Sequence, residues 1–535
     1  MSPRTWFGLI LGFSVLLKIG LNTQFVDWWY DGGYYAEIAR NVAEGRGLVS
    51  SVSMFHAGFP SFPFATAVYP AWPYLLGVVA RVVPLDVAAV WLPTLFYFGT
   101  VALMWPIGRR LLLRPVYAEV PGLDAGHVLM LLWALQSRFA EYTSRPYTEG
   151  MGFFCLALAV WRLLGVVERP SWRGGVEAGL WCVGIMLVRG PFVVVSGAVL
   201  LFLWVMVLLP DASRKSRVYT AISATLSAAL FAALVQHLWF DTIPNANFGT
   251  LVRFDSWVVQ PGLTPVNLLV DQASAAELFW DRLSGVGVAF MLGGKHGYFL
   301  NFGYAQYAPL LLLVALIGDL RARRLAVGAL LHPGIRPLLL VLFIGFAQLA
   351  ALQVIHKAVF AEWNFGMRHA IGVLWLFAPP LILLCQRDDS WRIVGRIVLW
   401  ATLGYGLMES AQRRGVLDLS PKVREQRQAL AAWLQEKKQE DPDLRVGHPD
   451  PQLIVRWTQG VGFITVHAFS TIDDICLMVR RDGLDYVLLP DRTADGSGFD
   501  FLKDRTWFDE DFLRVEAEVP KVKIYQPKEG ICSSP

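Results

Sequence analysis

The chain has 535 residues, of which 55% are hydrophobic and only 17% are charged, whereas soluble domains carry about 25% charged residues. The net charge of +4 is small, no basic stripe is interleaved with aromatic residues, and the five cysteines form no CxxC pair. These features argue against nucleic-acid binding and against a zinc or redox framework. The apolar excess ends near residue 411, so the composition predicts a polytopic α-helical membrane protein with a small C-terminal soluble domain.

The first apolar run covers residues 6–25 and is long enough to cross a bilayer, which takes about 20 mainly apolar residues. A signal peptide is the alternative, but the run has no small-residue cleavage site, so we expect an uncleaved helix. Further segments of the same character bring the predicted transmembrane helices to about eleven. These further segments are residues 86–108, 125–142, 147–168, 174–189, 191–209, 218–240, 303–320, 337–356, 368–386 and 393–411.

Positive charges in the short loops predict the orientation, because Lys and Arg concentrate in cytoplasmic loops. Alternate loops of the predicted threading hold clusters of basic residues, all on one side. The clusters are Arg109, Arg110 and Arg114; Arg169 and Arg173; Arg214, Lys215 and Arg217; Arg321, Arg323 and Arg324; and Arg387 and Arg392. We therefore expect a cytoplasmic N-terminus, with two long loops (residues 26–85 and 241–302) and the C-terminal domain facing outward.

The first long outer loop contains two segments that we expect to lie in the membrane interface. The stretch YYAEIARNVAEG has helical spacing, with apolar and charged residues on opposite faces. The apolar face has Tyr35, Ile38, Ala39 and Val42, and the charged face has Glu37, Arg40 and Glu44. Residues 69–83 are too short and too interrupted to span, which predicts a second interfacial helix.

The C-terminal part, residues 416–535, has the texture of a small α/β domain, and residues 1–415 form the membrane part. Short apolar strand patterns in LRVGHP, GFITV and DYVLLP are joined by the helix-like IDDICLMVRR, and the chain ends in a predicted hairpin. No Gly-rich phosphate loop and no catalytic constellation occurs here. Cys476 and Cys532 could form a disulfide or remain two free thiols, and the sequence favours free thiols.

Three acids are candidates for catalysis at the outer surface. Asp27 and Asp31 follow the first predicted span, and Glu149 begins another at its outer end. They could be solvated loop acids, or in the case of Glu149 a helix-start acid that complements the dipole. Ionisable groups beside a membrane usually have a function, and a carboxylate such as Asp31 could take the proton from an acceptor hydroxyl.

Several cationic and aromatic residues are candidates for substrate binding. Arg368 lies at the outer end of a predicted span, where it could snorkel to the interface or hold a phosphate through its planar fork of donors. Arg145 could pair with Glu149, and Arg189 lies in apolar sequence, so it is paired or functional. The remaining candidates are Lys295, His296, Tyr34 and Tyr35. No cluster has the spacing of a metal site, and no cofactor is implied.

Residues 28–32, WWYDG, resemble the WWDYG signature of oligosaccharyltransferase catalytic subunits with two letters exchanged. That signature belongs in a C-terminal soluble domain, whereas this stretch opens the first outer loop. We therefore attribute the similarity to chance.

Four stretches together resemble GT-C membrane glycosyltransferases of the protein O-mannosyltransferase and aminoarabinose transferase type. They are YDGGYYAEIARNVAEGRGL, YPAWPYLLG, RPYTEGMGFFCLALAV and MRHAIGVLWLFAPPLILL, and the resemblance extends over about 410 residues. The family pattern has an Asp-Glu or Asp-Asp pair before a Tyr and an interfacial helix. Here Gly32 replaces the second acid, which leaves Asp31 as the family's catalytic acid and puts any pair with Asp27 in doubt.

The resemblance implies a sugar donor carried on polyprenyl phosphate, used at the outer face of a plasma membrane, as in the bacterial inner membrane. Asp31 would activate a hydroxyl on a glycan, lipid or protein acceptor, the sugar would be transferred with inversion, and Arg368, with Lys295, would stabilise the phosphate. Alternatives are a transporter or flippase of lipid-linked sugars, a non-catalytic scaffold, and a ligase that uses a lipid diphosphate. A transporter would predict internal repeats, and we find none.

Overall fold

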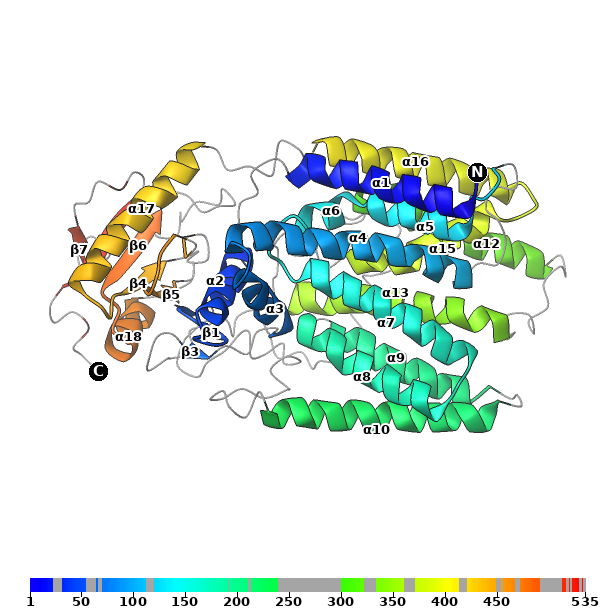
Figure 1. The fold of residues 1–535 in the computed structure, drawn as a ribbon, viewed down its shortest axis with the longest axis horizontal. Coiled ribbons are helices and arrows are strands. Elements are labelled where there is room, and N and C mark those ends of the chain that lie inside the picture. The colour runs from blue at the N-terminus through cyan, green and yellow to red at the C-terminus, as the bar shows by residue number, and fades with distance from the viewer. Residues whose placement is uncertain are drawn as a thin grey trace.

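Two parts of the chain, a long helical bundle and a mixed sheet, lie at opposite ends of the computed structural model (Figure 1). The structure describes residues 1–22, 31–53, 64–65, 70–111, 120–190, 192–209, 213–238, 300–321, 333–359, 371–412, 421–448, 454–455, 457–466, 472–490, 512–515, 519, 522–528 and 532.

The bundle consists of helices that pack along one another (Figure 1). They are α1 (Pro3–Asn22), α4 (Leu85–Leu111), α5 (Ala125–Ala134), α6 (Ser137–Tyr142), α7 (Glu149–Glu168), α8 (Trp172–Val188), α9 (Phe192–Val207), α10 (Arg214–Leu238), α12 (Ala308–Arg321), α13 (Arg336–Val359), α15 (Leu374–Cys385) and α16 (Trp391–Gln412). Short 3-10 helices are η4 (Leu300–Tyr307), η6 (Pro333–Ile335) and η7 (Ile371–Val373). Within the described residues each predicted span overlaps one of these helices, except that the third is divided between α5 and α6, and the spans at 303–320 and 368–386 also include η4 and η7.

Length and apolar character make four of the described helices, namely α1, α4, α7 and α10, able to cross a membrane by themselves. Several shorter apolar helices accompany them. The chain is therefore a membrane protein, while the count of eleven crossings and their orientation stay predictions.

Aromatic packing fills the centre of the bundle. Trp133 is fully buried, lies 5.2 Å from Trp375 between ring centroids, and meets Phe139 edge-on at 5.4 Å. Elsewhere small residues allow close helix contact: a Cβ on Gly175 of α8 would lie 2.3 Å from the Thr220 carbonyl oxygen of α10. In membrane bundles the hydrophobic effect does not drive helices together, because lipid is itself apolar, so small residues that allow close packing are enriched at helix contacts.

The six-stranded sheet has the order β2-β5-β4-β6-β8-β7. Its strands are β2 (Val52–Ser53), β5 (Gly462–Thr465), β4 (Arg445–His448), β6 (Tyr486–Pro490), β8 (Val522–Pro527) and β7 (Phe512–Val515). The first four pair in parallel and the last two antiparallel, with α17 (Pro421–Glu440) and α18 (Ile472–Asp482) beside them (Figure 1). The predicted strands, helix and C-terminal hairpin of this region are confirmed.

One strand of this sheet comes from the first outer loop. The Phe463 amide donates a 2.7 Å hydrogen bond to the Ser51 carbonyl oxygen, and Val52 pairs in register with Phe463. A second small sheet, β1 (Val49–Ser50) with β3 (Phe64–Ala65), lies beside it. The sequence division at residue 415 therefore does not divide the packing, because the loop contributes an edge strand to the C-terminal sheet.

The loop also contributes α2 (Asp31–Ala43) and α3 (Ala71–Ala80), which lie between the bundle and the sheet (Figure 1). One continuous hydrophobic core joins Ile38 of α2 and Trp72 of α3 to Leu434 of α17 and Phe463 of β5. Arg40 donates a 3.2 Å hydrogen bond to the Thr458 carbonyl oxygen across the same junction.

Glu37 departs from the predicted pattern, which placed it on a charged, water-facing side of the helix. Its side chain is buried, with a relative exposure of 4%. The carboxylate accepts hydrogen bonds from Asn41 Nδ2 at 2.8 Å, Ser50 Oγ at 2.8 Å, and the Ser51 amide and hydroxyl at 3.1 and 2.7 Å. The prediction failed because the chain that follows α2 folds back onto this face, where Ser50 and Ser51 satisfy the carboxylate, whereas periodicity alone assigns the face to water.

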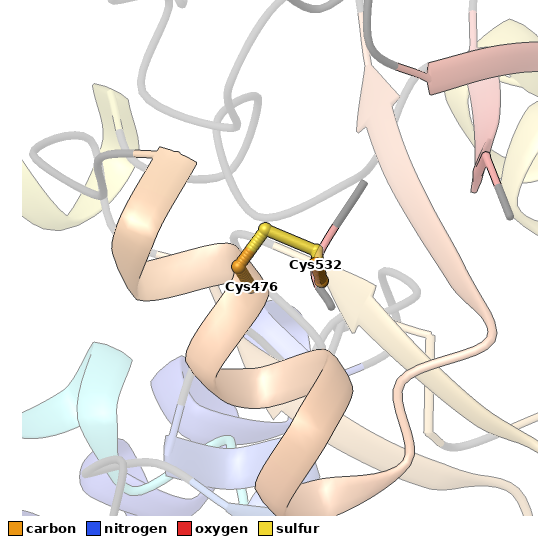
Figure 2. The surroundings of a disulfide bond; sticks show 2 residues. All are labelled: Cys476 and Cys532. Carbon is orange, nitrogen blue, oxygen red and sulfur yellow. A yellow bond between two sulfur atoms is a disulfide. The ribbon is translucent and has the colours of Figure 1, made fainter. Parts of the chain in front are cut away.

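A disulfide joins Cys476 of α18 to Cys532 near the C-terminus, and Figure 2 shows the bond. The sequence-based preference for two free thiols is therefore wrong. Folding brings the two α-carbons to 4.9 Å across a sequence separation of 56 residues, a proximity that cysteine spacing does not reveal.

We predict that Glu37→Ala destabilises the chain by about 3 kcal/mol, because it leaves buried donors of Asn41, Ser50 and Ser51 without their acceptor. Chemical unfolding of the purified protein in detergent measures this change. Glu44→Ala is the matched control on the same chain segment, since Glu44 has a side-chain exposure of 42%. That variant should stay within about 0.5 kcal/mol of wild type. Equal unfolding midpoints for the two variants would contradict the assigned role of Glu37.

Candidate functional site

Asp31 is the first residue of α2, at the junction between the bundle and the C-terminal sheet. The next residue is Gly32, where a Cβ atom would lie 3.2 Å from Cε1 of Tyr147 and 3.4 Å from Cγ of Pro146. Glycine therefore lets the start of α2 lie directly on the segment that leads into α7. Trp72 of α3 supports that segment by donating a 2.8 Å hydrogen bond to the Pro146 carbonyl oxygen.

The same arrangement brings the chain segments of Asp31 and Glu149 together, because Glu149 begins α7 two residues after Tyr147. Both carboxylates stand in the first turn of a helix. The positive end of a helix dipole stabilises a carboxylate there, which suits an acid that must be ionised in order to accept a proton.

Glu149 and Arg189 form a buried ion pair. Glu149 Oε1 lies 2.7 Å from Arg189 Nη1, and the two side chains are 1% and 3% exposed. The Arg189 guanidinium also lies 5.7 Å from the ring centroid of Phe153 and 5.9 Å from that of Phe192. Arg189 is therefore paired, as one of its two sequence interpretations proposed, and a functional role for it stays a prediction.

The carboxylate of Glu141 lies beside Arg145, whereas the sequence suggested Glu149 as a possible partner. The Nη2 atom of Arg145 lies 3.7 Å from Glu141 Oε1, and the other oxygen of Glu141 accepts a 3.1 Å hydrogen bond from Arg138. Arg145 and Glu141 are both buried. Glu141 therefore brings two arginine side chains of the α6 region into one polar cluster, a few residues before Pro146.

Lys18 is a buried charge that sequence reasoning missed. It is fully buried in α1 and donates hydrogen bonds to Thr143 Oγ1 at 2.8 Å, Ser144 Oγ at 2.6 Å, and the Ala140 carbonyl oxygen. The available signal was a single lysine inside the first apolar run, since charges inside spanning helices usually have partners. Lys18 thereby ties α1 to the segment that leads toward Pro146.

Tyr34 and Tyr35 were predicted to contact substrate, but both rings belong to the buried core at the junction. They are 3% and 2% exposed, and their ring centroids are 6.0 Å apart. This burial favours a packing role, in which the tyrosines fix the position of α2 and hence of Asp31. Burial lowers the pKa of Arg40 on the same helix, and the nearby Glu37 opposes that shift.

Four predicted site residues lie outside the described residues, so their roles stay predictions. They are Asp27, Lys295, His296 and Arg368. In the part of the chain that the structure describes, no group of three or more His, Cys, Asp or Glu side chains gathers as a metal site would.

Neither family models nor curated proteins match this sequence. Solved structures of the Archaeoglobus fulgidus oligosaccharyltransferase do match in fold. The apo form aligns with a TM-score of 0.57 at 12% identity, covering 91% of this chain and 69% of that one. The form tethered through a disulfide to an acceptor peptide with the NVT sequon gives 0.53 at 13%, with coverage of 91% and 69%. The complex with Zn and sulfate gives 0.51 at 14%, with coverage of 90% and 67%.

The chain therefore shares its fold with this oligosaccharyltransferase, which agrees with the GT-C fold that the sequence resemblance implied. At these identities the likeness concerns the fold alone. It does not distinguish between subfamilies such as the O-mannosyltransferases and the aminoarabinose transferases.

We predict that Glu149→Ala destabilises the chain by about 3–5 kcal/mol, because it leaves the Arg189 charge buried without its partner. Replacing both members with apolar residues, in Glu149→Leu with Arg189→Met, should recover much of the loss. Unfolding in detergent measures both variants.

Glu177→Ala is the matched control for this prediction. Its partner is Arg162, and the side chains of this pair are 33% and 47% exposed, so the loss should be at most about 1 kcal/mol. If Glu149→Ala proved no more destabilising than Glu177→Ala, the buried pair would not have the assigned importance.

Proposed function

We propose that this protein is a membrane glycosyltransferase that moves a sugar from a polyprenyl-phosphate donor to an acceptor hydroxyl at the outer face of the membrane. The observation that carries the proposal is the packing of the Asp31 end of α2 against Pro146 and Tyr147. This packing brings together the starts of α2 and α7, each of which begins with a carboxylate, at one end of a bundle that has the GT-C fold.

In the proposed reaction Asp31 accepts the proton of the acceptor hydroxyl as that oxygen attacks the anomeric carbon. A new bond forms between the acceptor oxygen and this carbon, and the bond from the carbon to the phosphate oxygen breaks. Polyprenyl phosphate leaves with the bonding electrons, and the configuration at the anomeric carbon is inverted. The donor tail lies in lipid, which explains why the acid stands at a membrane surface.

Arg368, with Lys295 and His296, is proposed to bind the phosphate and to stabilise the charge that grows on it as the sugar leaves. A guanidinium suits this task because its planar fork donates two parallel hydrogen bonds to phosphate oxygens. These residues remain proposals from the sequence.

Glu149 is proposed as a positioning residue and not as the base. A carboxylate that is 1% exposed and paired with Arg189 at 2.7 Å is poorly placed to exchange protons with an acceptor. The pair would instead fix the start of α7, and with it the Tyr147 ring against which Gly32 lies. Arg145 is proposed to orient the same segment through Glu141. Asp27 keeps a secondary role as a second acid near the acceptor.

A second candidate is transfer from a lipid diphosphate, as a glycan ligase would do it. The fold likeness to an oligosaccharyltransferase with a tethered acceptor peptide favours including it. Both candidates use the same end of the bundle. They differ in the donor, which carries a monophosphate in the first candidate and a diphosphate in the second.

We predict that the purified protein transfers sugar from a polyprenyl monophosphate in a panel that also contains polyprenyl diphosphate sugars. Mass spectrometry of the products identifies the donor used. Asp31→Asn should lower the transfer rate by about 10² to 10⁴-fold, the usual contribution of a general base, and leave the unfolding midpoint unchanged.

Glu44→Gln is the control for Asp31→Asn, because Glu44 follows α2 at its other end and is exposed. It should retain full activity. An Asp31→Asn protein as active as wild type would reject the proposed base. Transfer from diphosphate donors alone would select the ligase.

The predicted orientation has support from the Cys476–Cys532 bond, because disulfides persist in oxidising compartments outside the cytoplasm.

We predict that a thiol introduced by Gln439→Cys on α17 reacts with a membrane-impermeant maleimide in intact cells. A thiol introduced by Arg214→Cys at the start of α10 should react only after permeabilisation. The test uses a background in which the free cysteines Cys155, Cys182 and Cys385 are replaced by serine. The reverse labelling pattern would overturn the threading.

A further inference from the structure

A cavity of about 320 Å³ is lined by residues of α4, α7 and α8. The last turns of α4 and α7 and the start of α8 lie at the end of the bundle away from α2 (Figure 1). Since an α-helix rises 1.5 Å per residue, the lining residues from Trp161 to Arg169 lie about 18–30 Å from Glu149 along α7. The lining includes four arginines, Arg110, Arg162, Arg169 and Arg173, together with Trp161 and Glu177. We name it the arginine cavity. The proposed transfer reaction makes no use of it.

The charges of the arginine cavity are only partly neutralised within the described residues. Glu177 is matched by Arg162, whose Nε and Nη2 donate to the two carboxylate oxygens at 2.5 and 3.0 Å. No carboxylate of the described ranges forms an ion pair with Arg110, Arg169 or Arg173. The lining therefore attracts an anion.

Two of these arginines are held in place by contacts that leave donors for a ligand. Arg110 donates to the Trp161 carbonyl oxygen at 2.8 Å with Nη1, and its guanidinium lies 5.5 Å from the Trp161 ring centroid. Arg173 lies 5.4 Å from the ring centroid of Trp172. A guanidinium has five N–H donors, so several remain for phosphate oxygens. Ser171 caps the start of α8 beside them by accepting from the Gly174 amide.

The helix surface that leads away from the cavity toward the middle of the bundle is apolar. Arg173 and Glu177 line the cavity at helical spacing, and the stripe continues along α8 to Leu180 and Gly184. Leu180 is 44% exposed, and a Cβ on Gly184 would meet nothing within 4 Å. Trp172 is 60% exposed. Because exposed tryptophans are enriched at membrane–water interfaces, Trp172 indicates that the cavity lies at the level of an interface.

We propose that the arginine cavity binds the phosphate head group of an anionic lipid, whose acyl chain lies along the apolar stripe of α8. A soluble phosphate would use the arginines but not the stripe, so the combination favours an amphipathic ligand. Basic pockets between transmembrane helices are a known setting for anionic head groups. The proposal does not depend on the proposed transferase reaction, because the cavity and Asp31 are at opposite ends of the bundle.

The test measures lipid retention by the full-length protein in non-ionic detergent, titrated with phosphatidylglycerol or with phosphatidylcholine. Native mass spectrometry counts the bound lipids, and the melting temperature reports stabilisation, since a ligand that binds only the folded state raises it. Wild type should retain phosphatidylglycerol in preference to phosphatidylcholine. The double variant Arg169→Ala with Arg173→Ala should bind phosphatidylglycerol about thirtyfold more weakly. A basic residue near an anionic lipid surface contributes about 1 kcal/mol to binding, and the variant removes two of them.

The double variant Arg214→Ala with Lys215→Ala is the matched control, because it removes two positive charges at the start of α10 and leaves the arginine cavity intact. It should bind phosphatidylglycerol as wild type does. Glu177→Gln removes the negative charge of the cavity and should tighten binding, a gain that damage to the fold would not produce.

Three results would overturn the proposal. One is a wild type that does not distinguish the two lipids, and another is an equal loss in the α10 control. The third is full stabilisation by inorganic phosphate without lipid, which would make the ligand a soluble phosphate.

Discussion

The position of the first outer loop depends on the buried carboxylate of Glu37. A carboxylate inside a protein is costly unless hydrogen bonds satisfy it, and here Asn41, Ser50 and Ser51 supply them. These bonds join α2 to the chain that follows it, and that chain then enters the C-terminal sheet as β2. The helix that begins with Asp31 is thereby held from both sides, by α3 and the bundle on one and by the sheet on the other. Sites that need a fixed geometry benefit from this kind of support.

Buried charges recur where the helices meet this junction, and each described one has a partner of matching chemistry. Glu149 pairs with Arg189, Glu141 lies between Arg138 and Arg145, and Lys18 donates to oxygens of the α6 segment. Ion pairs in an apolar interior contribute more to specificity of arrangement than to stability, since desolvation offsets much of the attraction. In this bundle they orient the segment that carries Tyr147, which is the surface against which Gly32 lies.

The two ends of the bundle differ in chemistry. At the α2 end, acids occupy helix starts and a folded domain covers the loop. At the other end, arginines remain in an open cavity beside exposed tryptophan and leucine. This asymmetry agrees with the two proposals, in which one face uses a lipid-linked substrate and the other binds an anionic lipid.

Much of the architecture was predictable from the sequence, because apolar length and period depend on neighbouring residues alone. The helices of the bundle, the strands β4, β5 and β6, the helix α18 and the final hairpin all follow from such patterns. The proposal of Asp31 as the general base also came from local sequence, partly through the glycines that follow it, and it stays a proposal. The partners of individual side chains were not predictable from such local patterns. The sequence offered Glu149 as a possible partner of Arg145, favoured free thiols for Cys476 and Cys532, turned Glu37 toward water, and passed over Lys18.

Those outcomes depend on residues that are distant in the sequence and meet only after folding. Arg189 is 40 residues from Glu149, Lys18 is 125 residues from Thr143, and Arg40 is 418 residues from Thr458. Local periodicity reports which face of a helix is apolar, but it does not report what covers the other face. The sequence by itself determined a helical membrane chain with an α/β end, and it predicted helices in the first long loop. The tertiary structure alone decided that the two helices of this loop pack between the bundle and the sheet and that one of its segments becomes the edge strand β2. The physical reason is that the hydrogen bonds and the apolar core that hold the loop there come from both ends of the chain.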